Sequence, residues 1–406
     1  MTAIVLRTLN FSVHILERSS PTILQSQAAG IRAGPELHSF IETYVKDFDP
    51  DYALTAESFE IVSKNAEVEM TLPPQDPLRL TTWKCVYDML LRALVREEGL
   101  GSAVYQTGKK VEGLERADEK VVVKFRDVES DEVQMLEADL VTAVDGAHST
   151  VRKIVMEDMV QPKYAGYVTW RGRVPEGDVG PKTREAMKKR CVVMKGVDGG
   201  YMISWVSTSM IILDDLAYGA RYYVPADPAA NVGNKYEFVW IWYDPIPTDS
   251  TEFNATFTDV DGKEHFTTIP RGKIRSEVWQ RVLDRKDAVS NPHFIELLER
   301  TKEPFVSAIR DLAGTRSIFY NGKVLLVGDA FALCQPHAGG STSQAAYQAL
   351  ELKKALKGET TLPDWEQTCL RGAAAELQRS IGAAKFLFGG EIPKFIEKMV
   401  AKSEGQ

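Results

Sequence analysis

Apolar residues form short unbroken runs near both ends of the chain, and longer aromatic-rich runs between them. The runs at residues 13–16 and 324–327 contain almost no polar interruption, which is typical of strands buried on both faces of a parallel sheet. The middle of the chain is instead rich in β-branched and aromatic residues, which favours a separate antiparallel sheet. The segments that carry this second pattern are residues 168–174, 191–194, 201–205 and 238–243.

Helical periodicity is clearest after the last buried run. Ala345, Ala349 and Leu352 fall on one face of a helix, and Ser341 followed three residues later by Gln344 predicts a capping box at its start. Further helices are predicted at residues 3–9, 81–94 and 294–302, and the residues after 356 are helical and amphipathic, with a charged tail at 398–406.

Composition excludes several classes of protein. The chain has 406 residues, a size that fits two domains, and its net charge of −8 argues against a nucleic-acid surface. No apolar run is long enough to span a membrane, and no signal peptide is recognised at the start. The four cysteines have no metal-ligand or C-x-x-C spacing, so they are interpreted as reduced thiols of a cytoplasmic protein. They are Cys85, Cys191, Cys334 and Cys369.

Three acidic residues follow predicted strands directly. Glu17, Asp145 and Asp329 each stand at the carboxyl end of an apolar run, where open α/β sheets bind their ligands. After Asp329, Pro336 and the pair Gly339-Gly340 delay the next helix, whose start offers free N–H groups and the positive end of a dipole. A carboxylate facing such a helix start suits a ligand with a polyol and a developing negative charge, such as reduced flavin.

A resemblance supports this interpretation. The pattern G-D-A-x5-P-x-x-G, from Gly328 to Gly339, resembles the second flavin motif of FAD-dependent aromatic hydroxylases of the p-hydroxybenzoate hydroxylase type. The resemblance implies that Asp329 holds the ribitol of FAD and that the helix after Gly340 faces the flavin pyrimidine. The chain departs from the family at Ala332, where histidine is common.

Two further segments carry the same resemblance. Residues 145–152 match D-G-x-x-S-x-x-R, which implies that Asp145 positions the ribitol side of the flavin loop and that a serine caps the following helix. Arg32, in an Ile-Arg-Ala-Gly segment, is implied to bind the FAD pyrophosphate, because a guanidinium can grip phosphate oxygens bidentately. Trp83 stands where the family usually has arginine, so it could stack on the cofactor but cannot make the charged contact.

The beginning of the chain lacks one expected feature. An acid that binds a ribose should follow a G-x-G-x-x-G turn by about 20 residues, but Met1 lies only sixteen residues before Glu17. We therefore expect a Rossmann-like unit without its first strand. That strand is expected to belong between the strands at residues 13–16 and 324–327, and its absence is expected to weaken folding and flavin binding.

The middle segments narrow the resemblance. Residues 166–172, 239–243 and 304–311 resemble the substrate domain of the 2,6-dihydroxypyridine 3-hydroxylase branch, although any single tryptophan there favours sheet packing over substrate contact. The predicted fold is α/β: a Rossmann-like FAD-binding domain, an inserted antiparallel-sheet substrate domain and C-terminal helices. The predicted boundaries are residues 1–160 with 305–358, then 161–304, then 359–406.

The function implied is an FAD-dependent, NAD(P)H-using monooxygenase that hydroxylates an electron-rich aromatic or N-heteroaromatic ring through a flavin hydroperoxide. FAD and NAD(P)H are the expected cofactors, with no metal, and the expected partners are a small aromatic substrate and dioxygen; a homodimer is compatible with the sequence. The catalytic base is not assigned, since His337 could be that base or a structural residue. The alternative is a truncated or degenerate paralogue that does not bind FAD tightly. A plain NAD dehydrogenase is disfavoured because no second Rossmann fingerprint is present.

Overall fold

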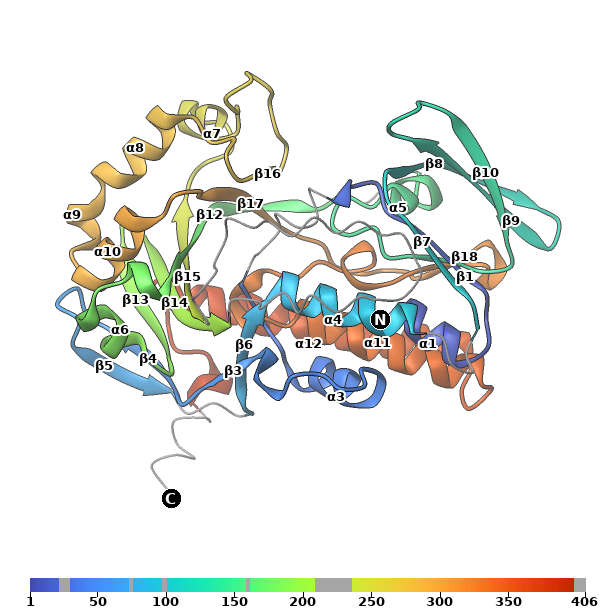
Figure 1. Cartoon of the computed structure of the whole chain (residues 1–406), viewed down its shortest axis with the longest axis horizontal. Helices are drawn as coiled ribbons and strands as arrows, with labels where there is room; N and C mark the ends of the chain where they lie inside the picture. The colour runs from blue at the N-terminus through green and yellow to red at the C-terminus, as the bar shows by residue number, and fades with distance from the viewer. Residues whose placement is uncertain (22–29, 73–75, 97–100, 158–160, 209–235, 398–406) are drawn as a thin grey trace.

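The computed structural model describes residues 1–21, 30–72, 76–96, 101–157, 161–208 and 236–397. A large twisted sheet lies at one end of the molecule, and the strands of the part that the sequence predicts to bind FAD lie toward the other, with long helices running between them (Figure 1). The predicted charged tail at 398–406 lies outside the described residues. Among the described helices, none combines the length and apolar character needed to cross a membrane.

The part that the sequence predicts to bind FAD contains two parallel strand pairs. Strand β1 (Val13–Leu16) pairs with β7 (Ala103–Gln106), and β11 (Val141–Ala143) pairs with β19 (Val324–Leu326). The other edge of β19 is occupied by the antiparallel strand β18 (Ile318–Phe319). The expected position of a further strand beside β19 is therefore wrong, because both of its edges are already paired. Among the described strands, β11 is an edge strand of this sheet and pairs with β19 alone.

Several of the described helices belong to the same part of the molecule. The helix α11 packs against α3 and α12, and small side chains such as Ala346 and Ala349 are fully buried along it. Residues with short side chains let neighbouring helices approach closely, which explains why a helix of low amphipathicity is central here. The bounds are α1 (Thr2–Thr8), α3 (Pro35–Tyr44), α4 (Trp83–Val95), α11 (Ser341–Leu356) and α12 (Leu362–Leu387).

The start of α11 differs from the predicted capping box. Gly340 is the N-cap residue and provides no side-chain cap, so Ser341 is already the first helical residue. The side chain of Gln344 does not reach back to the helix start but donates from Nε2 to the carbonyl of Ala332 at 2.9 Å. The capping box is therefore wrong, and the first N–H groups of α11 have no side-chain partner of that kind.

Two small sheets complete this part. One is antiparallel, with β6 (Leu78–Thr82) between β2 (Gly30–Arg32) and β3 (Leu54–Ala56). The other, formed by residues 109–138, was not predicted from the sequence, and its strands are exposed on one face, so they alternate between polar and apolar residues. Its strands are β8 (Lys109–Ala117), β9 (Lys120–Asp127) and β10 (Val133–Ala138).

The predicted second sheet is present and has eight strands in the order β16-β17-β12-β15-β14-β13-β4-β5. All its pairs are antiparallel except β13 with β4. The division proposed from the sequence leaves β4, β5 and β17 of this sheet outside residues 161–304. The bounds are β16 (Thr268–Ile269), β17 (Phe305–Asp311), β12 (Lys163–Pro175), β15 (Tyr236–Pro245), β14 (Gly200–Thr208), β13 (Arg190–Val197), β4 (Ser58–Val62) and β5 (Val68–Leu72).

The two faces of this sheet carry different side chains. The three tryptophans Trp170, Trp240 and Trp242 lie on one face, at 2% exposure or less, in a core that includes residues of the covering helices. Their assignment to sheet packing is confirmed. These covering helices include α6 (Pro181–Met187), α8 (Ser276–Asp284) and α10 (Pro292–Arg300), seen on the outer side of the sheet in Figure 1. The opposite face, which holds Tyr167, Tyr201 and Tyr243, packs against the end of α12. We call these three residues the tyrosine face.

Candidate functional site

The loop after β19, here called the GD loop (residues 327–331), turns at Gly328, whose positive φ of 63° is readily adopted only by glycine. Its N–H donates to Oε1 of Gln348 on α11 at 2.6 Å, which fixes the turn against the helix. Asp329 follows in the short helix η4 (Gly328–Ala330). Burial raises the pKa of its carboxyl to about 6, and the nearby Arg152 guanidinium opposes this shift. Asp329 is thus a buried carboxyl group with no ion pair to any residue that the structure describes.

The loop after β11, here called the DG loop (residues 144–149), leads into α5 (Thr150–Val155). Ser149 is the N-cap residue, and its Oγ accepts from the Arg152 N–H at 2.9 Å, which confirms the predicted cap. The carboxylate of Asp145 accepts from the Val151 N–H at 3.1 Å and from the Ser149 hydroxyl. Asp145 is exposed, and its carboxylate is used to hold the loop and the start of α5.

Arg152 joins these two loops. Its side chain is only 1% exposed, and Nη1 donates to the carbonyls of Ala330 at 2.9 Å and Asp329 at 3.3 Å. Nη2 donates to the carbonyl of Ala147 in the DG loop. A buried guanidinium with several fixed donors suits this bridging role. The sequence placed Arg152 within a motif but did not identify it as the residue that holds both loops together.

A glycine turn (residues 336–340) precedes α11. It begins with the short helix η5 (Pro336–Ala338), with Pro336 in its first position, and Gly339 follows with a φ of 63°. A Cβ on Gly339 would lie 2.9 Å from the Cβ of Arg32, and one on Gly340 would lie 1.8 Å from Oε1 of Glu376. The turn therefore favours glycine at both positions.

Arg32 lies against the glycine turn, far away in sequence. Its Nη1 donates to the Ala338 carbonyl at 3.2 Å, and its own carbonyl accepts from the Thr342 hydroxyl at 2.9 Å. Its Nη2 forms an ion pair with Asp76, which the sequence did not identify, while its buried Nε has no hydrogen-bond partner among the described residues.

A small pocket opens beside Arg32 at the start of α11. The Oγ of Ser343, in a side chain that is 8% exposed, has no hydrogen-bond partner in the described structure. This orphan hydroxyl, the orphan Nε of Arg32 and the uncapped start of α11 fit an acceptor-rich group such as a flavin. The pocket is lined by Arg32, Gly34, Pro35, Glu36, Asp76, Gly339, Gly340, Ser343 and Arg379.

Glu17 and Trp83 belong to a second group of residues. Glu17 follows β1, and its Oε1 accepts from the Ser19 N–H at 2.7 Å. Trp83, the first residue of α4, stacks on Tyr87 with ring centroids 4.8 Å apart and planes 14° apart. Tyr87 in turn contacts the hydroxyl of Tyr105 on β7 at 3.1 Å. Glu17 contributes to the raised pKa values of Tyr87 and Tyr105, although burial is the main cause.

The glycine turn also places His337 against the tyrosine face. Its ring lies 4.8 Å from that of Tyr243, 5.2 Å from Tyr167 and 5.7 Å from Tyr201, measured between centroids. Phe388, after α12, closes this cluster with its ring 5.7 Å from His337. The sequence named His337 but missed the tyrosines. The available signal was the alternation in β12 and β15, which places Tyr167 and Tyr243 on the opposite face from the tryptophans of the same strands.

Hydrogen bonds link His337 to both sides of this cluster. Its Nε2 lies 2.6 Å from the Tyr167 hydroxyl, and its Nδ1 is bonded to the Tyr201 hydroxyl. The Tyr167 hydroxyl also donates to Oε1 of Gln335 at 3.1 Å, and Gln335 donates from Nε2 to Asp311 at 2.7 Å. Burial lowers the pKa of His337 to about 3, so the imidazole is neutral near pH 7.

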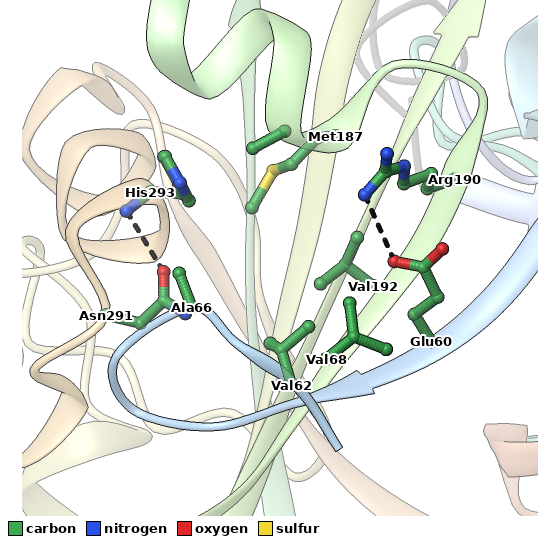
Figure 2. Close-up of a pocket in the computed structure, with 10 residues that line it drawn as sticks. Glu60, Val62, Ala66, Val68, Met187, Arg190, Val192, Asn291 and His293 are labelled. Atoms are coloured by element: carbon green, nitrogen blue, oxygen red, sulfur yellow. Dashed lines mark hydrogen bonds and ion pairs between the residues drawn. The ribbon is translucent and has the colours of Figure 1, made fainter. Parts of the chain in front are cut away.

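A further small pocket lies on the other face of the large sheet (Figure 2). Figure 2 shows Met187 and Val192 on its apolar side, the ion pair of Glu60 with Arg190, and His293 beside Asn291. Met187 and Val192 belong to the same core as Trp170, Trp240 and Trp242. The sheet itself therefore separates this pocket from the tyrosine face. None of the flavin-type motifs contributes a residue to it.

Family models match two overlapping parts of the chain. A model described as an FAD binding domain matches residues 1–212, which is more than half of the chain. A second model, described as FAD binding domain-like, matches residues 164–311, the region of the large sheet.

Individual proteins are similar over nearly the whole chain. The 2,6-dihydroxypyridine 3-monooxygenase of Paenarthrobacter nicotinovorans is 26% identical over 383 residues, which cover 93% of this chain and 86% of that protein. The solved structure of 2,6-dihydroxypyridine-3-hydroxylase from Arthrobacter nicotinovorans has a TM-score of 0.78 at 24% identity, covering 97% of this chain and 91% of the other. A salicylate hydroxylase substrate complex has a TM-score of 0.64 at 15% identity, covering 97% and 93%.

Proposed function

Since this chain belongs to the FAD-binding domain family and is an FAD-dependent monooxygenase of the p-hydroxybenzoate hydroxylase type, we propose that it hydroxylates an electron-rich aromatic or N-heteroaromatic ring with NAD(P)H and dioxygen. When bound, FAD would supply the redox chemistry, accepting electrons from NAD(P)H and activating dioxygen so that one oxygen atom is transferred to the ring. The protein supplies binding, orientation and exclusion of water.

One observation carries this proposal: the DG loop and Arg32, both distant in sequence from the GD loop and the glycine turn, are joined to these two segments by direct contacts. Arg152 donates hydrogen bonds to carbonyls of the GD loop and the DG loop. Gly339 of the glycine turn packs against Arg32 so closely that a Cβ atom there would clash. The polar groups without partners there, on Arg32 and Ser343, are groups that a polar cofactor would satisfy.

Within this site we assign separate roles to the predicted cofactor residues. Asp329 accepts hydrogen bonds from the ribitol, and the start of α11 after Pro336, Gly339 and Gly340 stabilises negative charge on reduced flavin. Arg32 binds the pyrophosphate after exchanging Asp76 for it. Glu17 binds a ribose hydroxyl, and Trp83 stacks on the cofactor. Asp145 holds the DG loop in place.

The ring is proposed to bind beside the glycine turn, on the side of the tyrosine face. Support comes from His337, which belongs to the glycine turn and contacts two of the three tyrosines. Dihydroxypyridines are the leading substrate class, because a relative that is similar over most of the chain is named as a 2,6-dihydroxypyridine 3-monooxygenase. A cytoplasmic location is proposed as well, supported by four cysteines that are all buried as free thiols.

Flavin content and ring-stimulated oxidation of NAD(P)H test this function together. The purified full chain is titrated with FAD, and bound flavin is measured by its visible absorbance. We expect hydroxylated aromatics and pyridines to accelerate NAD(P)H oxidation by the flavin-loaded protein, and aliphatic ketones to have no effect. Stimulation by ketones alone, with oxygen inserted beside the carbonyl, would assign a Baeyer–Villiger reaction instead, and failure to bind FAD would overturn the proposal.

A further inference from the structure

An acidic residue lies on the face of α12 that packs against the glycine turn. Ala373 and Ser380 on this face are 3% and 0% exposed, and Glu376 lies between them with its side chain 11% exposed. The Ser380 hydroxyl donates to the carbonyl of Gln335, directly before the glycine turn, so this face is held against the turn. Glutamate is rarely buried to this extent unless its oxygens have partners. Glu376 therefore calls for a specific explanation.

The two oxygens of Glu376 have different surroundings. Oε2 forms an ion pair with Arg379, one turn later on the same helix, whereas the buried Oε1 has no hydrogen-bond partner among the described residues. A Cβ added to Gly340 would lie 1.8 Å from this Oε1. Gly340 is the N-cap residue of α11 and offers no side chain to the helix start. The carboxylate thus fills the space beside the helix start that a capping side chain would otherwise take.

Charged and titratable groups face this carboxylate from the surrounding elements. Burial raises the pKa of Glu376, and the Arg379 guanidinium opposes this shift. From β2, the charge of Arg32 also lowers the pKa, whereas Glu36 in the first turn of α3 raises it. Cys334 is a neutral neighbour, because burial raises the pKa of its thiol to about 12. The positive end of the α11 dipole favours the ionised carboxylate as well.

Bound FAD would remove part of the support for this negative charge. Its pyrophosphate is proposed to bind Arg32, which neutralises one of the two cations that favour ionised Glu376. The start of α11 is proposed to stabilise negative charge on reduced flavin, so the flavin and Glu376 would share one helix dipole. Two negative charges in a buried site repel each other strongly, because water screens them poorly there. Reduction of the flavin is therefore expected to disfavour the ionised form of Glu376.

We propose that Glu376 takes up a proton when the flavin is reduced, and that it thereby makes the flavin potential depend more steeply on pH. This inference rests on the proposed function and adds a positioning residue to it. NAD(P)H gives two electrons and one proton to the flavin and leaves as NAD(P)⁺. One further proton, from solvent, forms an O–H bond on Oε1 of Glu376. No bond of the protein breaks, and the negative charge gained by the flavin is offset within the site.

Redox titration of the flavin-loaded full chain tests this coupling. Midpoint potentials are measured with an electrode and mediator dyes between about pH 5 and 9.5, in the unchanged chain and in Glu376→Gln. The two potentials should converge at low pH, where the side chain is neutral in both proteins. As the pH rises, the potential of Glu376→Gln should become higher by about 30 mV, which corresponds to a tenfold change in the equilibrium constant of a two-electron reduction.

The proton itself can be observed by infrared difference spectroscopy in an electrochemical cell. The reduced-minus-oxidised spectrum of the unchanged chain should contain the C=O band of a newly protonated carboxyl group, which shifts when H₂O is replaced by D₂O. Glu376→Gln should lack this band. Neither measurement depends on turnover, so the identity of the ring substrate does not affect the result.

Two variants separate proton uptake from other roles of this residue. Arg379→Gln breaks the same ion pair but keeps the acid, so it should keep the infrared band and the pH dependence, displaced to higher pH. Glu351→Gln is the matched control, because Glu351 is 19% exposed and pairs with Lys354 at 2.6 Å in the same i,i+3 arrangement. It lies about 15 Å along α11 from the helix start, and its variant should behave like the unchanged chain.

Three outcomes would overturn the inference. They are a potential difference between the unchanged chain and Glu376→Gln that is absent or the same at every pH, a carboxyl band that persists in Glu376→Gln, and loss of the band at every pH in Arg379→Gln. These outcomes leave the proposed function intact when FAD still binds and hydroxylated rings still accelerate NAD(P)H oxidation. Absence of bound FAD would instead overturn the function and the inference together.

Discussion

The two faces of the large sheet are made by the same strands and yet differ in chemistry. On the helix-covered face, the indole N–H groups of Trp170 and Trp240 donate to Asp244 at 3.0 Å and to Thr301 at 2.9 Å, inside an apolar core. On the tyrosine face, Tyr167 of β12 and Tyr201 of β14 are hydrogen-bonded to His337 in the glycine turn. A period of two along β12 and β15 thus separates residues that stabilise the fold from residues available for chemistry.

The largest expected effect tests the helix-covered face. Trp240→Ala should lower the free energy of unfolding by about 3–5 kcal/mol, because it opens a cavity in a core where Trp240 is fully buried. Tyr243→Phe, at a position on the same strand but on the tyrosine face, should cost about 1 kcal/mol or less. Urea unfolding of both variants measures this contrast. Similar losses in the two variants would show that both faces serve stability equally.

The next effect concerns the GD loop. We expect Asp329 in this loop, like the residues of the tyrosine face, to serve function more than stability. Asp329→Ala should weaken FAD binding by about 1.5–3 kcal/mol, roughly ten- to 150-fold, if the carboxylate accepts hydrogen bonds from the ribitol. Without FAD, the free energy of unfolding above about pH 6 should not fall in this variant, because burial disfavours the ionised Asp329 carboxylate. Unchanged affinity in an FAD titration would remove Asp329 from the site.

The raised pKa of Asp329 sharpens this prediction. Its carboxyl is protonated below about pH 6 in the free protein, whereas a ribitol hydroxyl donates best to the ionised form. FAD affinity should therefore be constant above about pH 7 and fall by up to about tenfold per pH unit below pH 6. Asp329→Ala should lose this dependence, which FAD titrations between pH 4.5 and 8 can measure. A slope that persists in the variant would place the titrating group elsewhere.

The same carboxyl group affects stability with the opposite sign. Since its pKa is raised on folding, Asp329 stabilises the FAD-free protein below about pH 4, and this contribution is lost as the pH rises through about 6. The lowered pKa of His337, about 3, acts in reverse: folding must hold the imidazole neutral, so stability falls as the pH drops below about 6.5. Comparing unfolding of His337→Gln and the unchanged chain between pH 4 and 7 isolates the second effect.

The sequence was informative wherever a signal was local. The buried run of β19, the serine cap at Ser149 and the strand pattern of the second sheet follow from neighbouring residues, and each is confirmed. The capping box at Ser341 failed because Gly340 adopts a helical conformation and starts the helix one residue earlier than predicted, which no side-chain pattern reveals.

Pairings between distant residues were not accessible from the sequence. The ion pair of Arg32 with Asp76 joins positions 44 residues apart, and His337 meets Tyr167 across 170 residues. Such contacts depend on strand order, and β4, β5 and β17 joined the large sheet from outside its expected boundaries. The expected placement of a further strand beside β19 was wrong for the same reason. The short antiparallel strand β18 occupies one edge of β19, and β11 occupies the other.

The smallest expected effect tests whether Asp76 competes with the FAD pyrophosphate for Arg32. Asp76 pairs with Arg32, and its side chain is 32% exposed, so the pair contributes only about 0.2–1 kcal/mol. If the FAD pyrophosphate must displace Asp76 to reach Arg32, Asp76→Asn removes both the competing ion pair and a repulsive charge. FAD should then bind about two- to fivefold more tightly, most clearly at low salt, because screening weakens both terms. Asp47→Asn, which breaks a comparable exposed pair with Arg96, should leave the affinity unchanged. Weaker binding in Asp76→Asn would mean that Asp76 orients Arg32 for the cofactor instead of competing with it.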